Sequence, residues 1–261
     1  MMGQIVHRLV GALGYAVIKK DRYRQLRALE HYVPSEEALT EHLRMVLSLY
    51  QVDCVFDVGA NDGWFRNWVR QKVGFTGLVV SFEPITAQAR ALEEKAVDDP
   101  LWIVRPYALG RYEEIRDFHI MESDVFSSFL KPDSNQPEKY VDSNKVRTST
   151  PVHVRTVAAE WKEISERHEV SRMHLKMDTQ GFDLEVFAGA EKVLDAIVTL
   201  QSELAFRQLY KHGADYQDAI RTYAAAGYKT STLQPISFDD QLRMIEADGV
   251  FVRDLQHLIP S

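Results

Sequence analysis

The feature that most constrains this chain is a pair of apolar segments about 20 residues apart, each of which ends in a turn. Residues 52–63 run from a strand pattern into a turn that contains Gly59 and Gly63, and residues 79–84 form a second strand that ends near Glu83. Glycine lacks a Cβ atom, so the backbone can turn tightly and approach a ligand. A carboxylate at the end of the next strand can accept hydrogen bonds from both hydroxyls of a ribose. The pair therefore predicts a Rossmann-like site for a nucleotide-type cofactor.

The turn departs from the G-x-G-x-x-G pattern of dinucleotide-binding proteins. Asn61 stands where the second glycine would face a pyrophosphate, and Asp57 and Asp62 would repel phosphate. Carboxylates suit a cofactor that has a ribose and an ammonium group, and S-adenosylmethionine has that chemistry. Taken singly, Asp57 could only tighten the turn, and Asn61 or Asp62 could only cap the following helix. Together with Glu83 they favour a cofactor site.

Length and composition favour one α/β domain with one sizeable core, because the chain has 261 residues and a hydrophobic content of 45%. We place this domain at residues 50–261, after a basic and helical N-terminal extension at residues 1–49. Within the domain, residues 111–172 interrupt the alternation of strands and helices and predict an insertion on the substrate side. The single cysteine, Cys54, excludes an intrachain disulfide and is interpreted as a core residue.

Charge is distributed unevenly along the chain. Residues 1–27 carry a formal charge of +5, which leaves −12 on the remainder of a chain whose total is −7. An acidic body argues against nucleic-acid binding. The basic segment also has an apolar helical stripe, so it could lie on an anionic membrane surface, or it could pack on its own domain or on a partner subunit of a homo-oligomer. We find neither a signal peptide nor a spanning segment in it, and expect a cytoplasmic protein, with the inner face of the membrane as the alternative location.

Strand and helix patterns alternate through most of the chain, as in βαβ units. Further strands are predicted at residues 102–107, 115–121, 152–157, 173–178, 198–203, 227–233 and 249–253, and helices at residues 35–50, 64–73, 86–96 and 182–194. The last two strands are interpreted as an antiparallel closing pair. The residues that follow the third strand, Ala108 and Leu109, could face an adenine ring or could form an ordinary turn. Ser123, Ser127 and Ser128 are weak candidates for polar contacts with a substrate.

Four segments resemble the FkbM-type methyltransferases, a branch of the Rossmann-like S-adenosylmethionine-dependent enzymes. They are residues 56–63, 82–84, 175–190 and 244–253, so the resemblance spans most of the predicted domain. It implies a class I methyltransferase fold: a mostly parallel seven-stranded sheet with one antiparallel strand and helices on both faces. It also implies methyl transfer to a hydroxyl of a sugar, a glycan or a natural product.

The resemblance also assigns roles to single residues. It implies that Asp57, Gly59 and Asn61 contact the methionine part of the cofactor, that Glu83 binds the ribose, and that Asp178 lies near the reacting methyl group. One segment departs from the family pattern, because Ala158 and the alanine after it stand where the family usually has a Leu-Asp pair.

Methyl transfer to an alcohol needs a base, and three residues near the carboxyl ends of strands are candidates. Asp178 ranks first, His212 second because the unperturbed pKa of histidine suits work near neutrality, and Glu203 third. His212 could instead be an exposed turn residue. Asp178 and Glu203 could also bind a divalent metal ion, or Lys176 could neutralise them.

Two other classes of function remain open on the residues alone. A nicotinamide-dependent oxidoreductase would use Glu83 for a ribose equally well, although the phosphate-binding glycines are absent. A non-catalytic binding protein could keep the fold without the reaction.

Overall fold

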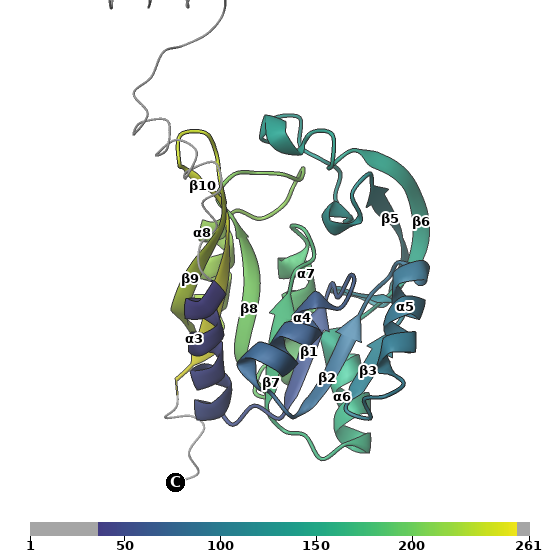
Figure 1. Ribbon diagram of the computed structural model, residues 1–261, viewed down its shortest axis with the longest axis vertical. Helices are drawn as coiled ribbons and strands as arrows, with labels where there is room; N and C mark the ends of the chain where they lie inside the picture. The colour runs from purple at the N-terminus through teal and green to yellow at the C-terminus, as the bar shows by residue number, and fades with distance from the viewer. Residues whose placement is uncertain (1–35, 255–261) are drawn as a thin grey trace, which may run out of the picture. The chain divides into compact units, whose positions relative to one another are not determined.

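The computed structural model describes residues 36–254. These residues form two sheets: a seven-stranded sheet that lies between two layers of helices, and a separate, smaller three-stranded sheet (Figure 1). The large sheet has the strand order β3-β2-β1-β7-β8-β10-β9. Its strands are β1 (Cys54–Val58), β2 (Leu78–Phe82), β3 (Trp102–Arg105), β7 (Met173–Met177), β8 (Ile197–Ala205), β9 (Tyr228–Phe238) and β10 (Met244–Arg253). Strand β10 alone runs in the opposite direction to the other strands of this sheet. The predicted Rossmann-like sheet with one antiparallel strand is therefore confirmed.

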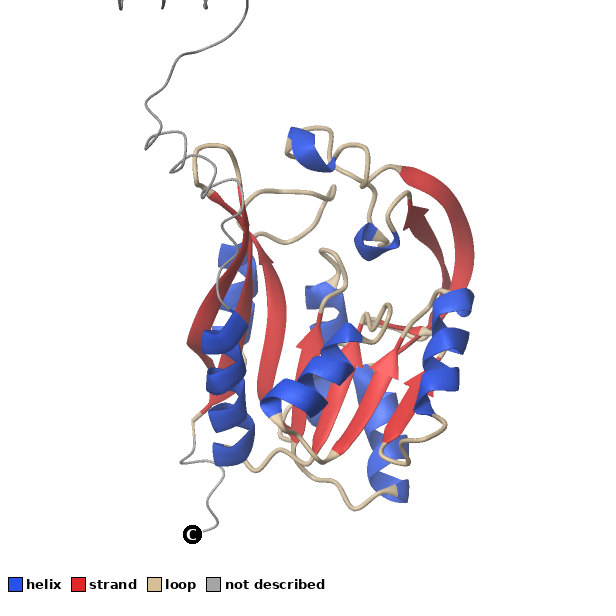
Figure 2. Ribbon diagram, in the orientation of Figure 1, coloured by secondary structure: helices blue, strands red, loops and turns tan. Residues whose placement is uncertain are grey.

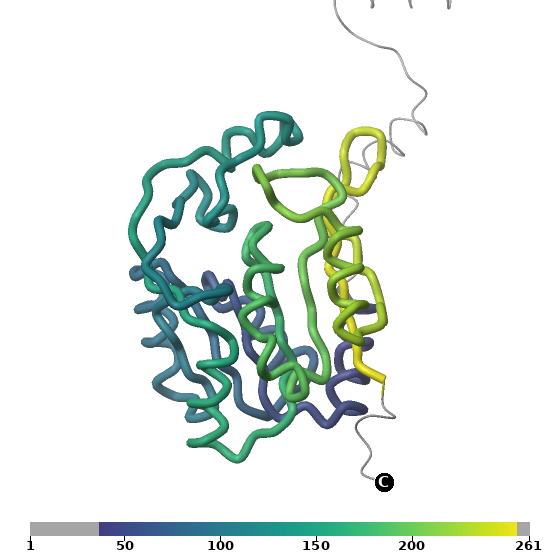
Figure 3. The backbone as a smooth tube through the Cα atoms, turned by 180° about the vertical axis from the view of Figure 1, so that it is seen from behind, coloured from purple at the N-terminus to yellow at the C-terminus, as the bar shows by residue number. Residues whose placement is uncertain are grey.

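Helices cover both faces of the sheet, as Figures 2 and 3 show from opposite sides. One layer consists of α3 (Glu36–Leu49), α4 (Trp64–Trp68) and α5 (Thr86–Ala96), and the other of α6 (Val157–Arg167), α7 (Asp183–Ala188) and α8 (Tyr216–Ala225). Every residue of β1, β2 and β7 is buried, which explains why β1 and β2 are mostly apolar, whereas β7 also buries His174 and Lys176. Leu43 of α3 is fully buried in one cluster with Val55 of β1, so this helix packs directly on the sheet.

Two helices were absent from the predicted elements. Residues 152–157 were expected to be a strand to their end, but β6 (Val146–Arg155) stops at Arg155 and α6 starts at Val157. The Thr156 side chain caps this helix by accepting a hydrogen bond from the backbone N–H of Ala159 at 3.1 Å. Asp215 caps α8 in the same way. In both places a local cap determines where the helix begins.

The helix expected at residues 182–194 is shorter in the structure. Helix α7 ends at Ala188, and a separate 3-10 turn follows at Glu191–Val193. Gly189 lies against the backbone of Gly110, and a Cβ atom there would come within 2.1 Å of the Gly110 carbonyl oxygen. This close approach requires a glycine and coincides with the end of the helix.

The closing strand pair also differs in detail from its prediction. Strands β9 and β10 are each longer than expected, and β10 lies inside the sheet between β8 and β9. Of this pair, β9 alone is therefore an edge strand.

The segment predicted as a substrate-side insertion contributes β5 (Glu114–Met121) and β6 to a second sheet with the order β4-β6-β5, and β4 (Ala108–Leu109) lies just before it. Strands β5 and β6 form a long antiparallel ribbon above the carboxyl ends of the large sheet (Figure 1). The chain between them carries the short helical turns Asp124–Phe126 and Glu138–Tyr140. The same segment, residues 111–172, also contains α6, which packs on the large sheet.

The basic segment at residues 1–27, for which contact with a membrane surface was considered, lies outside the described residues. Among the helices between residues 36 and 254, none is long and apolar enough to cross a membrane.

Candidate active site

A cavity of about 470 Å³ opens at the carboxyl ends of β1, β2, β7 and β8. Its walls come from the turns after β1, β2 and β7, from residues within β8 and β10, from the N-terminus of α4 and from the insertion. The polar residues that line it are Asn61, Asp62, Glu83, Gln88, Asp124, Ser127, Lys176, Asp178, Thr179, Gln180, Gln201, Glu203 and Asp248. This is the place where open parallel sheets bind ligands.

The turn after β1 is held tightly against its neighbours. The backbone N–H groups of Gly59 and Ala60 both donate to the carbonyl oxygen of Phe82 at 3.1 Å. Gly59 has φ of +79°, and a Cβ atom there would lie 2.0 Å from the carbonyl oxygen of Asp178. Glycine is therefore required at this position for two reasons: its backbone is left-handed, and the backbone of Asp178, just after β7, leaves no room for a Cβ atom.

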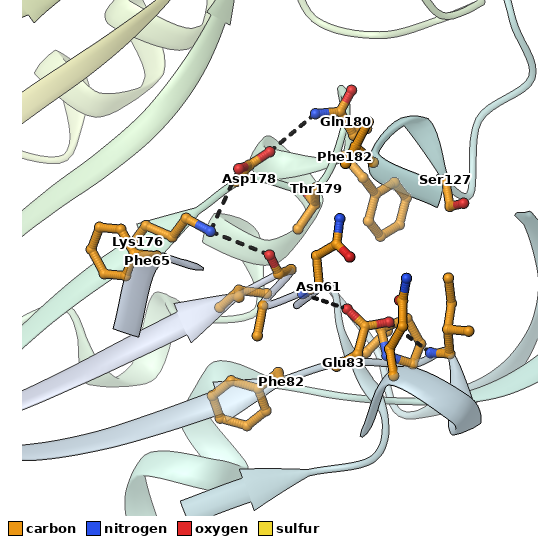
Figure 4. A pocket seen from close by; sticks show the side chains of 18 of the residues that line it. Asn61, Phe65, Phe82, Glu83, Ser127, Lys176, Asp178, Thr179, Gln180 and Phe182 are labelled. Atoms are coloured by element: carbon orange, nitrogen blue, oxygen red, sulfur yellow. Dashed lines mark hydrogen bonds and ion pairs between the residues drawn. The ribbon is translucent and has the colours of Figure 1, made fainter. Parts of the chain in front are cut away.

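Glu83 is fixed by two backbone hydrogen bonds (Figure 4). The N–H of Asn61 donates to Oε2 and the N–H of Ile85 donates to Oε1, each at 2.8 Å. Desolvation raises the pKa of this carboxyl to about 7, although the two backbone donors oppose the shift. A carboxylate has about four acceptor positions. Glu83 therefore keeps acceptor capacity on both oxygens for a ligand in the cavity.

The wall beside Glu83 is apolar. It is formed by Phe82, Ile85, Ala108, Leu109, Phe118 and Phe129. Such a wall can accept a flat, weakly polar ring next to the hydrogen-bonding carboxylate.

Asp57 lies beneath the cavity and does not line it. Its Oδ1 accepts a hydrogen bond from Lys176 Nζ at 3.0 Å, and its Oδ2 accepts one from Ser81 Oγ at 3.1 Å. Lys176 also donates to the carbonyl oxygen of Gly59 at 3.3 Å and lies 3.6 Å from Asp178 Oδ2. The buried ion pair thus supports the turn after β1 from below.

Gln180 connects two carboxylates, that of Asp178, which directly follows β7, and that of Glu203 in β8. Its Nε2 donates to Asp178 Oδ1 and to Glu203 Oε2, both at 3.0 Å. Its Oε1 lies 2.8 Å from the Tyr210 hydroxyl, and its backbone carbonyl accepts a hydrogen bond from Ser128 Oγ at 2.8 Å. One glutamine therefore connects the floor of the cavity to the insertion.

The carboxylates on the β8 side of the cavity raise one another's pKa values. Desolvation and then Glu246 raise the pKa of Glu203 well above its ordinary value. Desolvation and then Asp178 raise the pKa of Asp248 to about 7. Both shifts favour the protonated acids when no ligand is present.

The structure brings together most of the residues that the sequence selected. The cavity is lined by Gly59, Asn61, Asp62, Glu83, Ala108, Leu109, Asp178 and Glu203, and also by Ser127. His212 is an exposed turn residue with φ of +63° and does not line the cavity. Asp62 lines the cavity, and its Oδ1 accepts a hydrogen bond from the N–H of Trp64 at the start of α4, whose N-cap residue is Gly63. The chemical roles of these residues stay predictions.

Six polar residues of the cavity were not selected from the sequence: Gln88, Asp124, Thr179, Gln180, Gln201 and Asp248. Gln201 and Glu203 are two residues apart in β8, so their side chains lie on the same face of the strand. The sequence alone could have indicated this shared face once Glu203 was selected. Asp248 is opposite Glu203 in the β8–β10 register, and this pairing depends on the order of strands in the sheet.

A metal site was considered at Asp178 and Glu203. Across residues 36–254, the structure has no group of three or more His, Cys, Asp or Glu side chains arranged to hold a metal ion.

The family model of the methyltransferase FkbM domain matches residues 57–230 of the chain. Among solved structures, the chain resembles the methyltransferase FkbM from Methylobacillus flagellatus KT, with a TM-score of 0.49, 14% identity, and coverage of 77% of this chain and 43% of that one. It also resembles magnesium protoporphyrin IX methyltransferase from Synechocystis PCC 6803 with bound SAM, with a TM-score of 0.44, 11% identity, and 96% coverage of each chain. An rRNA methylase from Streptococcus thermophilus matches with a TM-score of 0.41, 13% identity, and coverage of 85% of this chain and 99% of that one.

The chain thus spans less than half the length of the Methylobacillus protein. A comparison with curated protein sequences gave no match.

Proposed function

Because the chain belongs to the FkbM methyltransferase family, with the class I methyltransferase fold, we propose that it is an S-adenosylmethionine-dependent O-methyltransferase that acts on a hydroxyl of a sugar, a glycan or a natural product. The observation that carries the proposal is the fixed carboxylate of Glu83. It faces a cavity beside the glycine turn of β1, with both oxygens held by backbone N–H groups.

The lining of the cavity fits the parts of this cofactor. Glu83 would accept hydrogen bonds from the two ribose hydroxyls, and the apolar wall at Ala108 and Leu109 would face the adenine ring. The turn at Gly59 and Asn61 would hold the methionine part. The turn offers no glycine-rich cradle for a pyrophosphate, which weighs against a nicotinamide dinucleotide.

The protein's part in the reaction is to align the acceptor and to take its proton. Bound S-adenosylmethionine supplies a methyl group on a sulfonium sulfur, which keeps the electron pair of the broken C–S bond as the acceptor oxygen bonds to the methyl carbon. Holding an acceptor in line in this way can lower a barrier by about 7–11 kcal/mol. A correctly placed base adds a factor of about 10²–10⁴.

Asp178 is the base that the geometry favours. Its side chain is 43% exposed and lines the cavity, and one of its oxygens is held by Gln180. Glu203 is less suited, because its raised pKa favours the protonated acid, which cannot accept a proton. His212 lies outside the cavity lining.

Calorimetric titration of S-adenosylmethionine and S-adenosylhomocysteine into the wild type and Glu83→Gln tests the proposal. Two charge-assisted hydrogen bonds are lost in the variant, so we expect affinity for both ligands to fall at least about tenfold. Glu93→Gln, an exposed substitution on α5 with the same change of charge, is the matched control and should bind like the wild type. Equal affinity of the wild type and Glu83→Gln would contradict the assigned ribose contact.

A further inference from the structure

The cavity has an acidic end that is separate from Glu83 and its apolar wall. We define it by Asp178, Gln201, Glu203 and Asp248, all of which line the cavity. Gln201 and Glu203 are alternate residues of β8, and Asp248 of β10 is opposite Glu203 in the register. Asp178 follows the last residue of β7, the neighbouring strand. Three adjacent strands therefore direct this set of side chains to one place.

The hydrogen-bond donors around the acidic end are already engaged within the protein. Lys176 Nζ donates to Asp57 Oδ1 and to the carbonyl oxygen of Gly59, and it also lies within ion-pair distance of Asp178. Gln180 Nε2 donates to Asp178 and to Glu203. What the acidic end offers to a ligand is therefore mainly acceptor capacity.

Gln201 provides independent evidence that a ligand at the acidic end donates a hydrogen bond. Its side chain is 4% exposed, lines the cavity and hydrogen-bonds to the carboxylate of Asp248. Its Oε1 atom is buried and has no hydrogen-bond partner in the described part of the chain. Buried acceptors are nearly always paired, so this atom calls for a ligand that donates.

Charge narrows the choice of ligand. Within the described residues, the acidic side chains that line the cavity are Asp62, Glu83, Asp124, Asp178, Glu203 and Asp248, whereas Lys176 is the one basic side chain. Arg147 neutralises Asp124, and Lys176 is paired with Asp57. A bound cation would favour ionisation of Glu203 and Asp248 and an anion would oppose it, so the crowded acids disfavour a phosphorylated or carboxylated acceptor. A neutral diol would donate hydrogen bonds but would leave the carboxylates uncompensated.

We propose that the acidic end binds a protonated amine on the acceptor, so that the enzyme methylates the hydroxyl of an amino alcohol such as an amino sugar. An ammonium group has three donors and one positive charge, which match a set of carboxylates with an unpaired amide oxygen. This inference rests on the proposed methyltransferase function, because it assigns the acidic end to the acceptor.

The test uses the full chain saturated with S-adenosylhomocysteine, near neutral pH and with EDTA present to exclude binding through a metal ion. Glucosamine, glucose and glucuronate share a ring and differ mainly in charge, and their dissociation constants can be measured by ligand-observed NMR. We expect glucosamine to bind about tenfold more tightly than glucose, and glucuronate to bind most weakly. Equal or tighter binding of glucose or glucuronate would overturn the proposal, and so would the absence of binding by all three.

A substitution locates the effect. Asp248→Asn keeps the size of the side chain and should abolish the preference for glucosamine, while Asp240→Asn, with the same change of charge on an exposed loop, should retain it. Glu203→Gln is a second variant in case Asp248→Asn fails to fold. A preference that survives in both Asp248→Asn and Glu203→Gln would refute the assignment. Failure of the wild type to bind S-adenosylhomocysteine would instead refute the proposed function on which this inference rests.

Discussion

Lys176 Nζ lies 3.0 Å from Asp57 Oδ1, and both side chains are buried under the turn that follows β1. Desolvation acts to lower the pKa of Lys176, but the carboxylates of Asp57 and Asp178 outweigh it and raise that pKa above its ordinary value. The lysine therefore stays charged and supports the turn on which Gly59 and Asn61 lie.

Removal of this lysine should strongly destabilise the fold. Lys176→Met leaves Asp57 buried with Ser81 as its remaining side-chain donor, and a buried pair broken on one side costs about 3–5 kcal/mol of unfolding free energy. Urea denaturation of the variant and of Lys162→Met, an exposed substitution on α6, provides the comparison. The control should change by less than about 0.5 kcal/mol. A loss below about 1 kcal/mol in Lys176→Met would contradict this account of the pair.

Gln180 should contribute to stability through the two carboxylates that it joins. Gln180→Leu removes both donors from between Asp178 and Glu203, and a buried group left without its partner costs about 1–3 kcal/mol, with the lower end applying to partly buried groups such as these. We expect the unfolding free energy to fall by at least about 1 kcal/mol in urea denaturation. Gln217→Leu, on the exposed surface of α8, is the matched control. A variant as stable as this control would show that the bridge is not maintained in solution.

Much of the sheet and the cofactor half of the cavity could be predicted from the sequence, because the signals are local. A buried parallel strand is an apolar run, and its last residues lie at the ligand side of the sheet. Glu83 and Asp178 could therefore be located from strand ends alone, and both line the cavity.

The remaining features depend on contacts between distant segments. Gln180 meets Glu203 and Tyr210 only after the chain has folded, and Asp248 meets Glu203 only through the strand order of the sheet. Asp57 was expected in the cavity because it belongs to the motif, but alternation along β1 directs its side chain toward Lys176. The start of α6 had a local signal in Thr156, which the preceding strand pattern obscured.

Cofactor affinity should depend on pH through Glu83. Its pKa is raised to about 7, so much of the carboxyl is protonated below that pH when the cavity is empty. The ionised form is the better acceptor for ribose hydroxyls. We therefore expect the affinity for S-adenosylhomocysteine to increase as the pH rises from 6 to 8, by up to about tenfold per unit below the pKa. Calorimetry over this range should show the dependence in the wild type and a flatter one in Glu83→Gln. An equal slope in both proteins would assign the dependence to another group.

The stability of the empty protein should change with pH in the opposite sense. A carboxyl whose folded-state pKa is raised keeps its full contribution below the ordinary value, 4.5, and loses it as the pH rises to about 7. As the pH rises across this window, the wild type should therefore lose unfolding free energy relative to Glu83→Gln. Urea denaturation at several pH values measures it, and a constant difference would argue against the raised pKa.

Asp178 and His212 can be distinguished as the base by paired substitutions. Asp178→Asn keeps the shape of the side chain but removes the proton acceptor, so kcat should fall by about 10²–10⁴ with cofactor affinity largely retained. His212→Asn tolerates the left-handed backbone at this turn, and its effect should be far smaller because the side chain lies outside the cavity lining. Transfer of a labelled methyl group measures both. A larger loss in His212→Asn than in Asp178→Asn would reverse the assignment.

The most direct test of the central claim is calorimetric titration of S-adenosylhomocysteine and of NAD into the same preparation of the wild-type protein. The account predicts saturable, one-site binding of S-adenosylhomocysteine and no measurable binding of NAD, because the cavity offers a ribose-binding carboxylate without a pyrophosphate cradle. Binding of NAD in the absence of S-adenosylhomocysteine binding would contradict it.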